Sequence, residues 1–181
     1  MKYYQMVQLK NGTEALLRNG DFSDGAAVYE NFNLTHEETD YLLSYSDENS
    51  YDAEQEAHFL QQKAESANEI EIIAIIDGKV AGTAGIEAVG NKYKVKHRAE
   101  LGISILKEFW GLGLGKALMK ACIQCAEEAG YKQLELNVVA ENERAVSLYR
   151  SMGFEEFGRN PRGFNSRING YQELVYMLLQ L

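Results

Sequence analysis

The stretch FWGLGLGKAL, residues 109–118, places three glycines at alternate positions directly before a helical pattern. Glycine is a poor helix former and adds conformational freedom to the unfolded chain, so such a cluster indicates backbone that something bulky approaches. A helix is predicted from Leu114 to Ala129, because the apolar residues after the glycines repeat with helical spacing. The start of a helix exposes unpaired N–H groups and a partial positive charge. This stretch therefore suits a phosphate or pyrophosphate, with Lys116 as a nearby cation.

The glycine spacing differs from that of two familiar phosphate-binding loops. The dinucleotide pattern G-x-G-x-x-G requires a third glycine, and this chain has Lys116 or Leu118 there, depending on the starting point. The P-loop pattern G-x-x-x-x-G-K-[ST] requires a glycine at Trp110 and a hydroxyl residue at Ala117. A nucleotide-binding protein of either kind is therefore disfavoured, while a purely structural glycine turn remains an alternative.

The rest of the sequence predicts a mixed α/β order, with strands first in hairpins and later joined through helices. A chain of 181 residues with 45% hydrophobic residues can form a sizeable core, and we expect one domain over residues 1–181. The turn Asp77–Gly78 predicts a two-residue hairpin loop. Strands are expected within 1–18, 69–89, 95–106, 131–139, 154–158 and 171–181, and helices within 24–35, 52–67, 114–129 and 141–152.

The net charge of −9 comes from one part of the chain. Residues 19–62 contain eleven acidic residues and no lysine or arginine, whereas the remainder is slightly basic. One interpretation is a solvated surface that aids solubility. The other is an acidic wall that attracts a cationic substrate. Under either interpretation a nucleic-acid backbone is not an expected partner.

Composition also bears on location, metals and assembly. No apolar run approaches the roughly 20 residues of a membrane span, and the opening residues do not resemble a signal peptide. Two cysteines suggest a reducing compartment, so we expect a cytoplasmic protein that does not act at a membrane. Cys122 and Cys125 lie on the apolar stripe of their helix, which predicts a buried role. The three histidines lack metal-ligand spacing, so no metal is expected. The sequence does not determine the oligomeric state, and a homodimer is one of the assemblies compatible with it.

A second motif, NVVAENERAVSLYRSMGF, covers residues 137–154. Together with the glycine loop, it resembles the GCN5-related N-acetyltransferase (GNAT) superfamily over residues 98–158. The first family signature is Q/R-x-x-G-x-G/A; here Trp110 replaces the usual first residue and is followed by Gly111, Leu112, Gly113, Leu114 and Gly115. The second is N-x-x-A-x-x-L-Y-x-x-x-G-F, matched at Asn142, Ala145, Leu148, Tyr149, Gly153 and Phe154.

The resemblance implies a fold and a cosubstrate. The fold is that of acyl-CoA N-acyltransferases, a central, mostly antiparallel sheet flanked by helices. The cosubstrate is acetyl-CoA, whose pyrophosphate in the family sits on glycine-loop amides, here Trp110 to Lys116. Its pantetheine arm pairs like an extra strand with the preceding strand, here at Ile103, Ser104 and Ile105. Trp110 removes the usual cationic or amide side chain, which leaves the backbone amides as the main phosphate contacts.

The resemblance also implies roles for Tyr149 and Asn142. It puts Tyr149 beside the thioester sulfur and Asn142 on the cofactor. A phenol with a pKa near 10 is protonated at neutral pH and can donate its proton to a thiolate leaving group. Because Asn142 precedes Tyr149 by seven residues, both are expected on nearly one face of a helix. Tyr149 is therefore the candidate general acid, while an ordinary core tyrosine is the alternative.

Glu100 is the candidate base. It lies on the polar face of the strand that the cofactor would join, although an ordinary surface or ion-paired carboxylate is the alternative. Glu135 shares a strand face with Asn137, the position at which some relatives carry a base, but it lies one pair further away, so it ranks lower. Relatives that acetylate protein N-termini can use a glutamate at the position that Asn137 occupies here, which argues against that role.

These features predict an N-acetyltransferase that moves acetyl from acetyl-CoA to a primary amine by direct attack in a ternary complex. The acceptor is a small molecule, or a lysine or N-terminal amine of a polypeptide. Residues 19–62 would border a cationic acceptor. Alternatively, an anionic acceptor group would bind Arg159, Arg162 and Arg167, on an expected flexible loop. The rival class is a noncatalytic module that binds acyl-CoA as a sensor.

Overall fold

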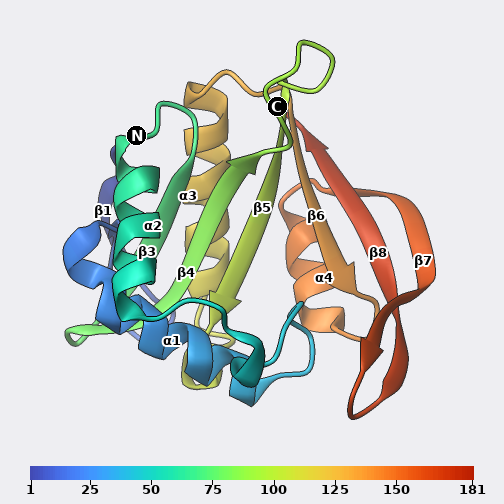
Figure 1. Cartoon of the computed structure of the whole chain (residues 1–181), viewed down its shortest axis with the longest axis horizontal. Coiled ribbons are helices and arrows are strands. Elements are labelled where there is room, and N and C mark those ends of the chain that lie inside the picture. Colours follow the sequence, from blue (N-terminus) through green and yellow to red (C-terminus); the bar gives the residue numbers. More distant parts are fainter.

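The computed structural model describes all 181 residues as one twisted sheet with helices on both faces (Figure 1). The strands are β1 Tyr4–Gln8, β2 Glu14–Asn19, β3 Ile70–Ile76, β4 Lys79–Ala88, β5 Arg98–Ile105, β6 Gln133–Val139, β7 Glu155–Ser166 and β8 Gly170–Gln180. The helices are α1 Gly25–Glu38, α2 Ala53–Glu65, α3 Leu114–Glu128 and α4 Glu143–Ser151. None of these helices is long and apolar enough to cross a membrane. The expected mixed α/β order is confirmed.

The eight strands lie in the order β1-β2-β3-β4-β5-β6-β8-β7, and every neighbouring pair is antiparallel except β5 and β6. The parallel pairing of β5 with β6 is short and ends where Glu100 lies opposite Glu135. Beyond Glu100 the two strands share no ladder. The second half of β5 therefore has a free edge toward β6, and this free edge positions the site.

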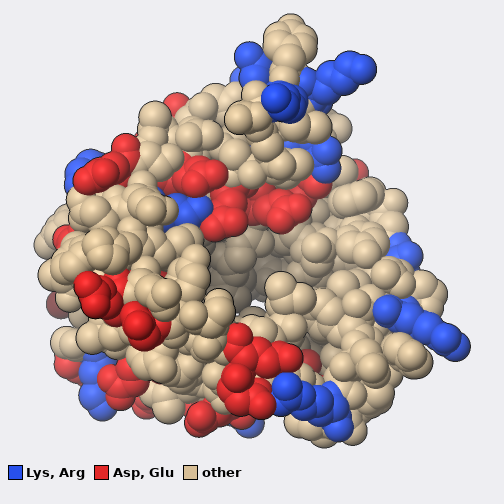
Figure 2. All heavy atoms as spheres, viewed as in Figure 1, with Lys and Arg blue, Asp and Glu red and all other residues tan.

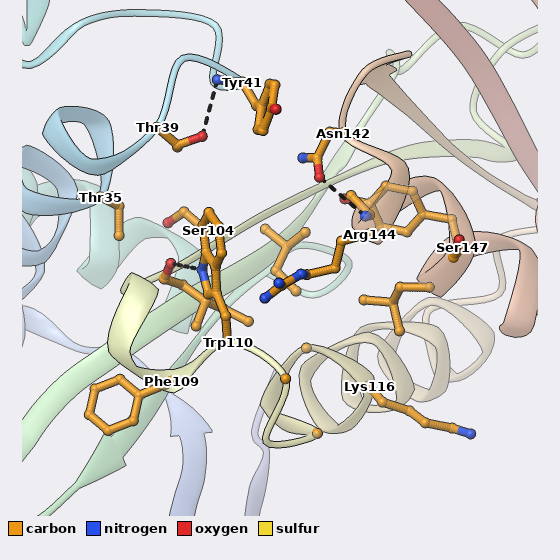
Figure 3. A pocket seen from close by; sticks show the side chains of 18 of the residues that line it. Thr35, Thr39, Tyr41, Ser104, Phe109, Trp110, Lys116, Asn142, Arg144 and Ser147 are labelled. Atoms are coloured by element: carbon orange, nitrogen blue, oxygen red, sulfur yellow. Dashed lines mark hydrogen bonds between the residues drawn. The ribbon is translucent and has the colours of Figure 1, made fainter.

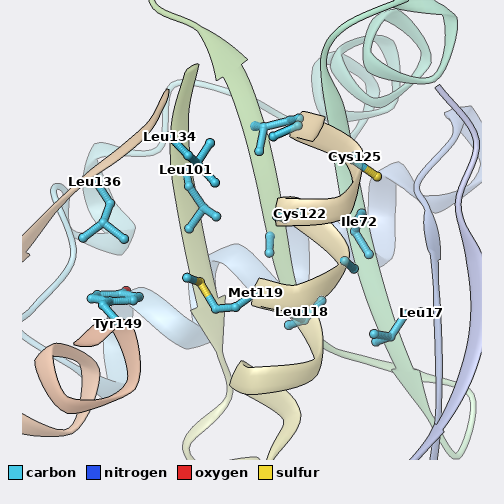
Figure 4. Close-up of a cluster of buried hydrophobic side chains, with 14 of the residues drawn as sticks. Leu17, Ile72, Leu101, Leu118, Met119, Cys122, Cys125, Leu134, Leu136 and Tyr149 are labelled. Carbon is cyan, nitrogen blue, oxygen red and sulfur yellow. The ribbon is translucent and has the colours of Figure 1, made fainter. Parts of the chain in front are cut away.

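The two faces of the sheet are covered differently. Helices α3 and α4 pack on one face over the larger core, whereas α1 and α2 lie across the other (Figures 1 and 4). The apolar stripe of α3 is buried there, including both cysteines, and burial raises the pKa of the Cys125 thiol to about 11. The buried role expected for the two cysteines is confirmed. The core under α1 and α2 has four buried residues, which are Val28, Leu60, Ile73 and Val80.

The prediction of a flexible loop between the last two strands is wrong. Strand β7 continues to Ser166 and forms a long hairpin with β8 that turns at residues 167–169. The second half of this strand was not predicted from the sequence, because Pro161 cannot donate a ladder hydrogen bond and usually argues against a strand. The pairing of β7 with β8 shifts register between Asn160 and Phe164, which accommodates the proline without ending the strand.

Candidate active site

Three neighbouring cavities surround the free edge of β5. The cofactor cavity, about 480 Å³, lies between the glycine loop and α4. The central cavity, about 300 Å³, lies between β5 and β6. The acidic cavity, about 610 Å³, lies between the sheet and helices α1 and α2. Ile103 lines all three, Tyr149 lines the cofactor and central cavities, and Glu100 lines the central and acidic cavities.

The glycine loop holds its amides free for a ligand. Gly111 and Gly113 have positive φ angles of 78° and 95°, which L side chains rarely adopt. The N–H groups of residues 111–113 donate to no main-chain carbonyl, and the first turn of α3 leaves further amides without intrahelical acceptors. At Gly115, an added Cβ would lie 3.1 Å from Leu148 of α4, so this glycine allows close approach of the two helices. The loop therefore presents a positively polarised backbone surface that fits an anionic group.

Side chains around the loop add positive charge. Arg144 lies over the ring of Trp110, 5.2 Å from its centroid, and both side chains meet inside the cofactor cavity (Figure 3). Trp110 Nε1 donates to the carbonyl of Ile105 at 2.7 Å, which fixes the indole against the end of β5. Lys10 also lines the cavity, whereas Lys116 extends away from its centre (Figure 3). Lys10 and Arg144 are not predicted from the sequence; the signal for Arg144 was its place in the first turn of α4.

Most of the residues predicted to bind the cofactor gather in this cavity. Those that line it are Ile103, Ser104, Ile105, Trp110, Gly111, Gly113, Gly115, Lys116 and Asn142. Leu112 and Leu114 do not line it, because their side chains pack into or against the main core. These two residues can reach a ligand only through their backbone amides.

Tyr149 and Asn142 meet at the junction of the cofactor and central cavities. Tyr149 is buried, and burial raises the pKa of its phenol to about 12, so the hydroxyl keeps its proton at neutral pH. Asn142 lies just before α4 rather than inside it. Its side-chain oxygen caps the helix by accepting from the amide of Ala145 at 3.2 Å. The amide nitrogen of Asn142 makes no hydrogen bond within the chain, so it can donate to a ligand.

Three glutamates form a row across the sheet, since Glu87, Glu100 and Glu135 are register partners on β4, β5 and β6. The two outer carboxylates have cationic partners. Arg98 forms a two-pronged ion pair with Glu135, and its hydrogen bonds lower the pKa of that carboxyl. Lys63 pairs with Glu87 at 2.8 Å. Glu100 has no ion pair and is exposed to both the central and the acidic cavity.

The charged segments singled out in the sequence are largely engaged elsewhere. Arg167 pairs with Asp47 at 2.8 Å, and Arg159 pairs with Glu173 at 2.7 Å. None of the three arginines of the β7–β8 hairpin lines any of the three cavities. From the acidic segment 19–62, only Glu48 and Glu56 line the acidic cavity. An anionic acceptor site at the arginines is therefore not supported.

Comparison with known proteins agrees with this geometry. The Acetyltransferase (GNAT) family matches residues 29–154, and the chain therefore belongs to the GNAT family of acetyltransferases. L-amino acid N-acetyltransferase AaaT of Escherichia coli is 30% identical over 108 residues, which is 59% of this chain and 65% of that protein. Human N-acetyltransferase 8B is 32% identical over 89 residues, 49% of this chain and 39% of that protein. The matched part thus spans less than two thirds of either relative.

Solved structures extend the likeness to nearly the whole chain. A GNAT-family acetyltransferase from Streptococcus pneumoniae superposes with a TM-score of 0.88 at 30% identity, covering 92% of this chain and 99% of that one. The putative acetyltransferase yncA of Salmonella typhimurium, solved with its cofactor acetyl-CoA, gives a TM-score of 0.80 at 20% identity, with 92% and 94% covered. The expected fold, a mostly antiparallel sheet flanked by helices, is confirmed.

Proposed function

We propose that this chain transfers the acetyl group of acetyl-CoA to a primary amine, by direct attack in a ternary complex. The amine belongs to a small molecule, or to a lysine or N-terminus of a polypeptide. The observation that carries the proposal is that the three cavities adjoin one another and share lining residues. Tyr149 lines both the cofactor and the central cavity, and Glu100 lines both the central and the acidic cavity, so the central cavity lies between the glycine loop and the acceptor side.

The residues of the cofactor cavity fit acetyl-CoA. The free amides of the glycine loop and the guanidinium of Arg144 suit a pyrophosphate. The unpaired edge of β5 offers main-chain groups to an extended amide-containing chain. Acetyl-CoA, when bound, supplies an activated thioester. The relative from Salmonella typhimurium, described with acetyl-CoA as its cofactor, supports the same cosubstrate.

Two side chains of the central cavity suit proton transfer. An amine with a pKa near 10.4 is mostly protonated at neutral pH, so a base must remove a proton before attack. Glu100 serves as this base, directly or through water, because it faces the acceptor side without an ion pair. Glu135 is excluded from the role, since Arg98 holds its carboxylate. Tyr149 donates its proton to the departing thiolate.

The test measures release of free thiol from acetyl-CoA against polyamines, aminoglycosides, amino acids and basic peptides. We expect turnover with at least one amine, and a loss of kcat/KM on the order of a hundredfold in Glu100→Gln. Glu155→Gln, an exposed carboxylate of β7, is the matched control and should change little. Acetyl-CoA binding without turnover of any amine would instead support the noncatalytic sensor.

A further inference from the structure

We propose that the acidic cavity binds the second ammonium group of a diamine or polyamine whose other amine accepts the acetyl group. The inference rests on the proposed function and names its substrate class. It starts from the carboxylates that line this cavity. The acidic residues of the lining are Glu48, Glu56, Glu71, Glu87 and Glu100, and the lining contains no lysine or arginine.

The floor of the cavity is a trough built by two glycines. Glu71, Gly85 and Gly102 are register partners on β3, β4 and β5. The Glu71 side chain lies across Gly85, where an added Cβ would sit only 2.0 Å from Glu71 Oε2. An added Cβ at Gly102 would meet nothing within 4 Å. No side chain therefore stands between the Glu71 carboxylate and β5, the strand that carries Glu100.

The roof of the cavity contributes acceptor groups that lack donors. Asn31 of α1 is 2% exposed, and its Oδ1 has no hydrogen-bond partner, although its Nδ2 donates to the carbonyl of Val80 at 2.9 Å. Glu56 of α2 is 7% exposed and forms no ion pair or hydrogen bond through its side chain. Asn31 Oδ1 is sealed from solvent, so the acceptor that a ligand in the cavity can reach is the carboxylate of Glu56. A ligand that brings N–H donors satisfies this carboxylate. The lining of the cavity therefore fits a ligand that is both cationic and a hydrogen-bond donor.

The charge balance points the same way. Lys63 is shared between Glu87 and Glu69, and no cation pairs with Glu56, Glu71 or Glu100. His36 also lines the cavity, and burial lowers the pKa of its imidazole, so it adds no charge at neutral pH. Figure 2 shows acidic side chains along the upper edge of the central hollow, beside a basic side chain. An ammonium group fits better than a metal ion, because no three carboxylate, imidazole or thiol groups converge as metal ligands.

The distance between the Glu71 carboxylate and the acetyl-CoA beside β5 determines how far apart the two amines of the substrate must be. Neighbouring strands lie about 4.8 Å apart. The Glu71 carboxylate lies over β4, and the proposed acetyl-CoA would lie beyond β5, so the two are about two strand spacings apart. An amine several methylenes from the reacting amine spans such a gap, and its alkyl chain would lie along Gly85 and Gly102. Amines of this kind carry a positive charge at neutral pH, since their pKa resembles that of lysine, about 10.4.

The test compares α,ω-diamines of three to six methylenes, and spermidine, with monoalkylamines of equal length. We expect kcat/KM for the best diamine to exceed that of its matched monoamine by about tenfold or more, which is the effect of roughly 1.4 kcal/mol of ion pairing. Glu71→Gln and Glu56→Gln should reduce this ratio toward one while leaving monoamine turnover within about twofold. Glu30→Gln, an exposed α1 carboxylate next to Asn31, makes the same charge change outside the cavity and should preserve the ratio.

Calorimetric titration of spermidine into the full chain separates this proposal from the proposed function. Spermidine binding that Glu71→Gln weakens about tenfold, without turnover of any amine, would support the cation site and reject the acetyltransferase. Turnover of monoamines and diamines at equal kcat/KM would reject the cation site and leave the acetyltransferase standing. An equal loss in Glu30→Gln would also overturn the proposal, because the effect would then come from overall charge.

Discussion

The carboxylate of Glu71 lies directly against the backbone of Gly85, where a Cβ would come within 2.0 Å of Glu71 Oε2. Real Cβ atoms do not approach another atom so closely, so the two residues depend on each other. The pair occupies neighbouring strands in direct register. Glycine at position 85 is thus a condition for placing the Glu71 carboxyl group on the floor of the acidic cavity.

Gly85→Ala is therefore expected to destabilise the protein chiefly through Glu71. The collision displaces the end of the flexible Glu71 side chain, while the carbonyl oxygen of Ile70 lies 3.0 Å from the added Cβ. The expected cost in the free energy of unfolding is therefore at the lower end of the roughly 1–3 kcal/mol of overpacking. In a Glu71→Ala background the same substitution should cost less, with a coupling energy of about 1 kcal/mol or more. Chemical denaturation of the four proteins of this double-mutant cycle measures the coupling. Equal costs in the two backgrounds would contradict the inferred contact.

Stability should depend on pH through Glu71. Burial raises the pKa of its carboxyl from 4.5 to about 7 in the folded chain, whereas the unfolded chain keeps the ordinary value. The contribution of Glu71 to the free energy of unfolding is therefore most favourable below pH 4.5, where both states are protonated. It is lost as the pH rises to about 7, because ionisation then favours the unfolded chain. Glu71→Gln should raise the melting temperature by a few degrees at pH 8 and change it little at pH 4. Glu30→Gln should show no such pH dependence.

Tyr149→Phe should abolish most turnover without weakening cofactor binding. The substitution removes only the hydroxyl, and loss of a general acid lowers kcat by about a hundredfold or more. Because the pKa of Tyr149 is raised to about 12, the wild-type rate should show no alkaline limb from this group below pH 10. Thiol release measures the rate, and Tyr93→Phe, an 85% exposed tyrosine, is the control. Unchanged turnover in Tyr149→Phe would remove the phenol from the reaction.

Gly113→Ala should weaken acetyl-CoA binding. A side chain at φ 95° costs about 1–2 kcal/mol, and relief of that strain would turn the loop amides away from the cavity. Gly130→Ala is a matched control, since Gly130 follows the other end of α3 with a φ of 84° and open space around it. Both variants should lose stability, but only Gly113→Ala should lose affinity, by about tenfold.

Trp110 provides the readout for that comparison. It is the only tryptophan of the chain and lies in the cofactor cavity against Arg144, so its fluorescence should change when acetyl-CoA binds. A titration followed at this single fluorophore yields the dissociation constant of each variant. Equal affinities for Gly113→Ala and Gly130→Ala would show that the conformation of the loop does not govern binding.

Much of the fold could be predicted from local patterns. The alternation along β5 places Glu100, Gly102 and Ser104 on one face. All three line the acidic cavity, although Leu101 and Ile103 between them also reach it. The hairpin at Asp77–Gly78 and the apolar stripe of α3 are equally local signals. The strand β7 was missed beyond Gly158 because its stability comes from pairing with β8 and not from its own residues.

The sequence by itself determined the family, the glycine loop and the candidate acid and base, because these depend on residue types at fixed spacing. Only the tertiary structure decided which carboxylates are free. Arg98 is two residues from Glu100 but pairs with Glu135 on the next strand, and Lys63 reaches Glu87 from α2. The carboxylates that line the acidic cavity likewise come mainly from strands β3 to β5 rather than from residues 19–62. Electrostatic partnership is set by distances across strands and helices, which sequence separation does not encode.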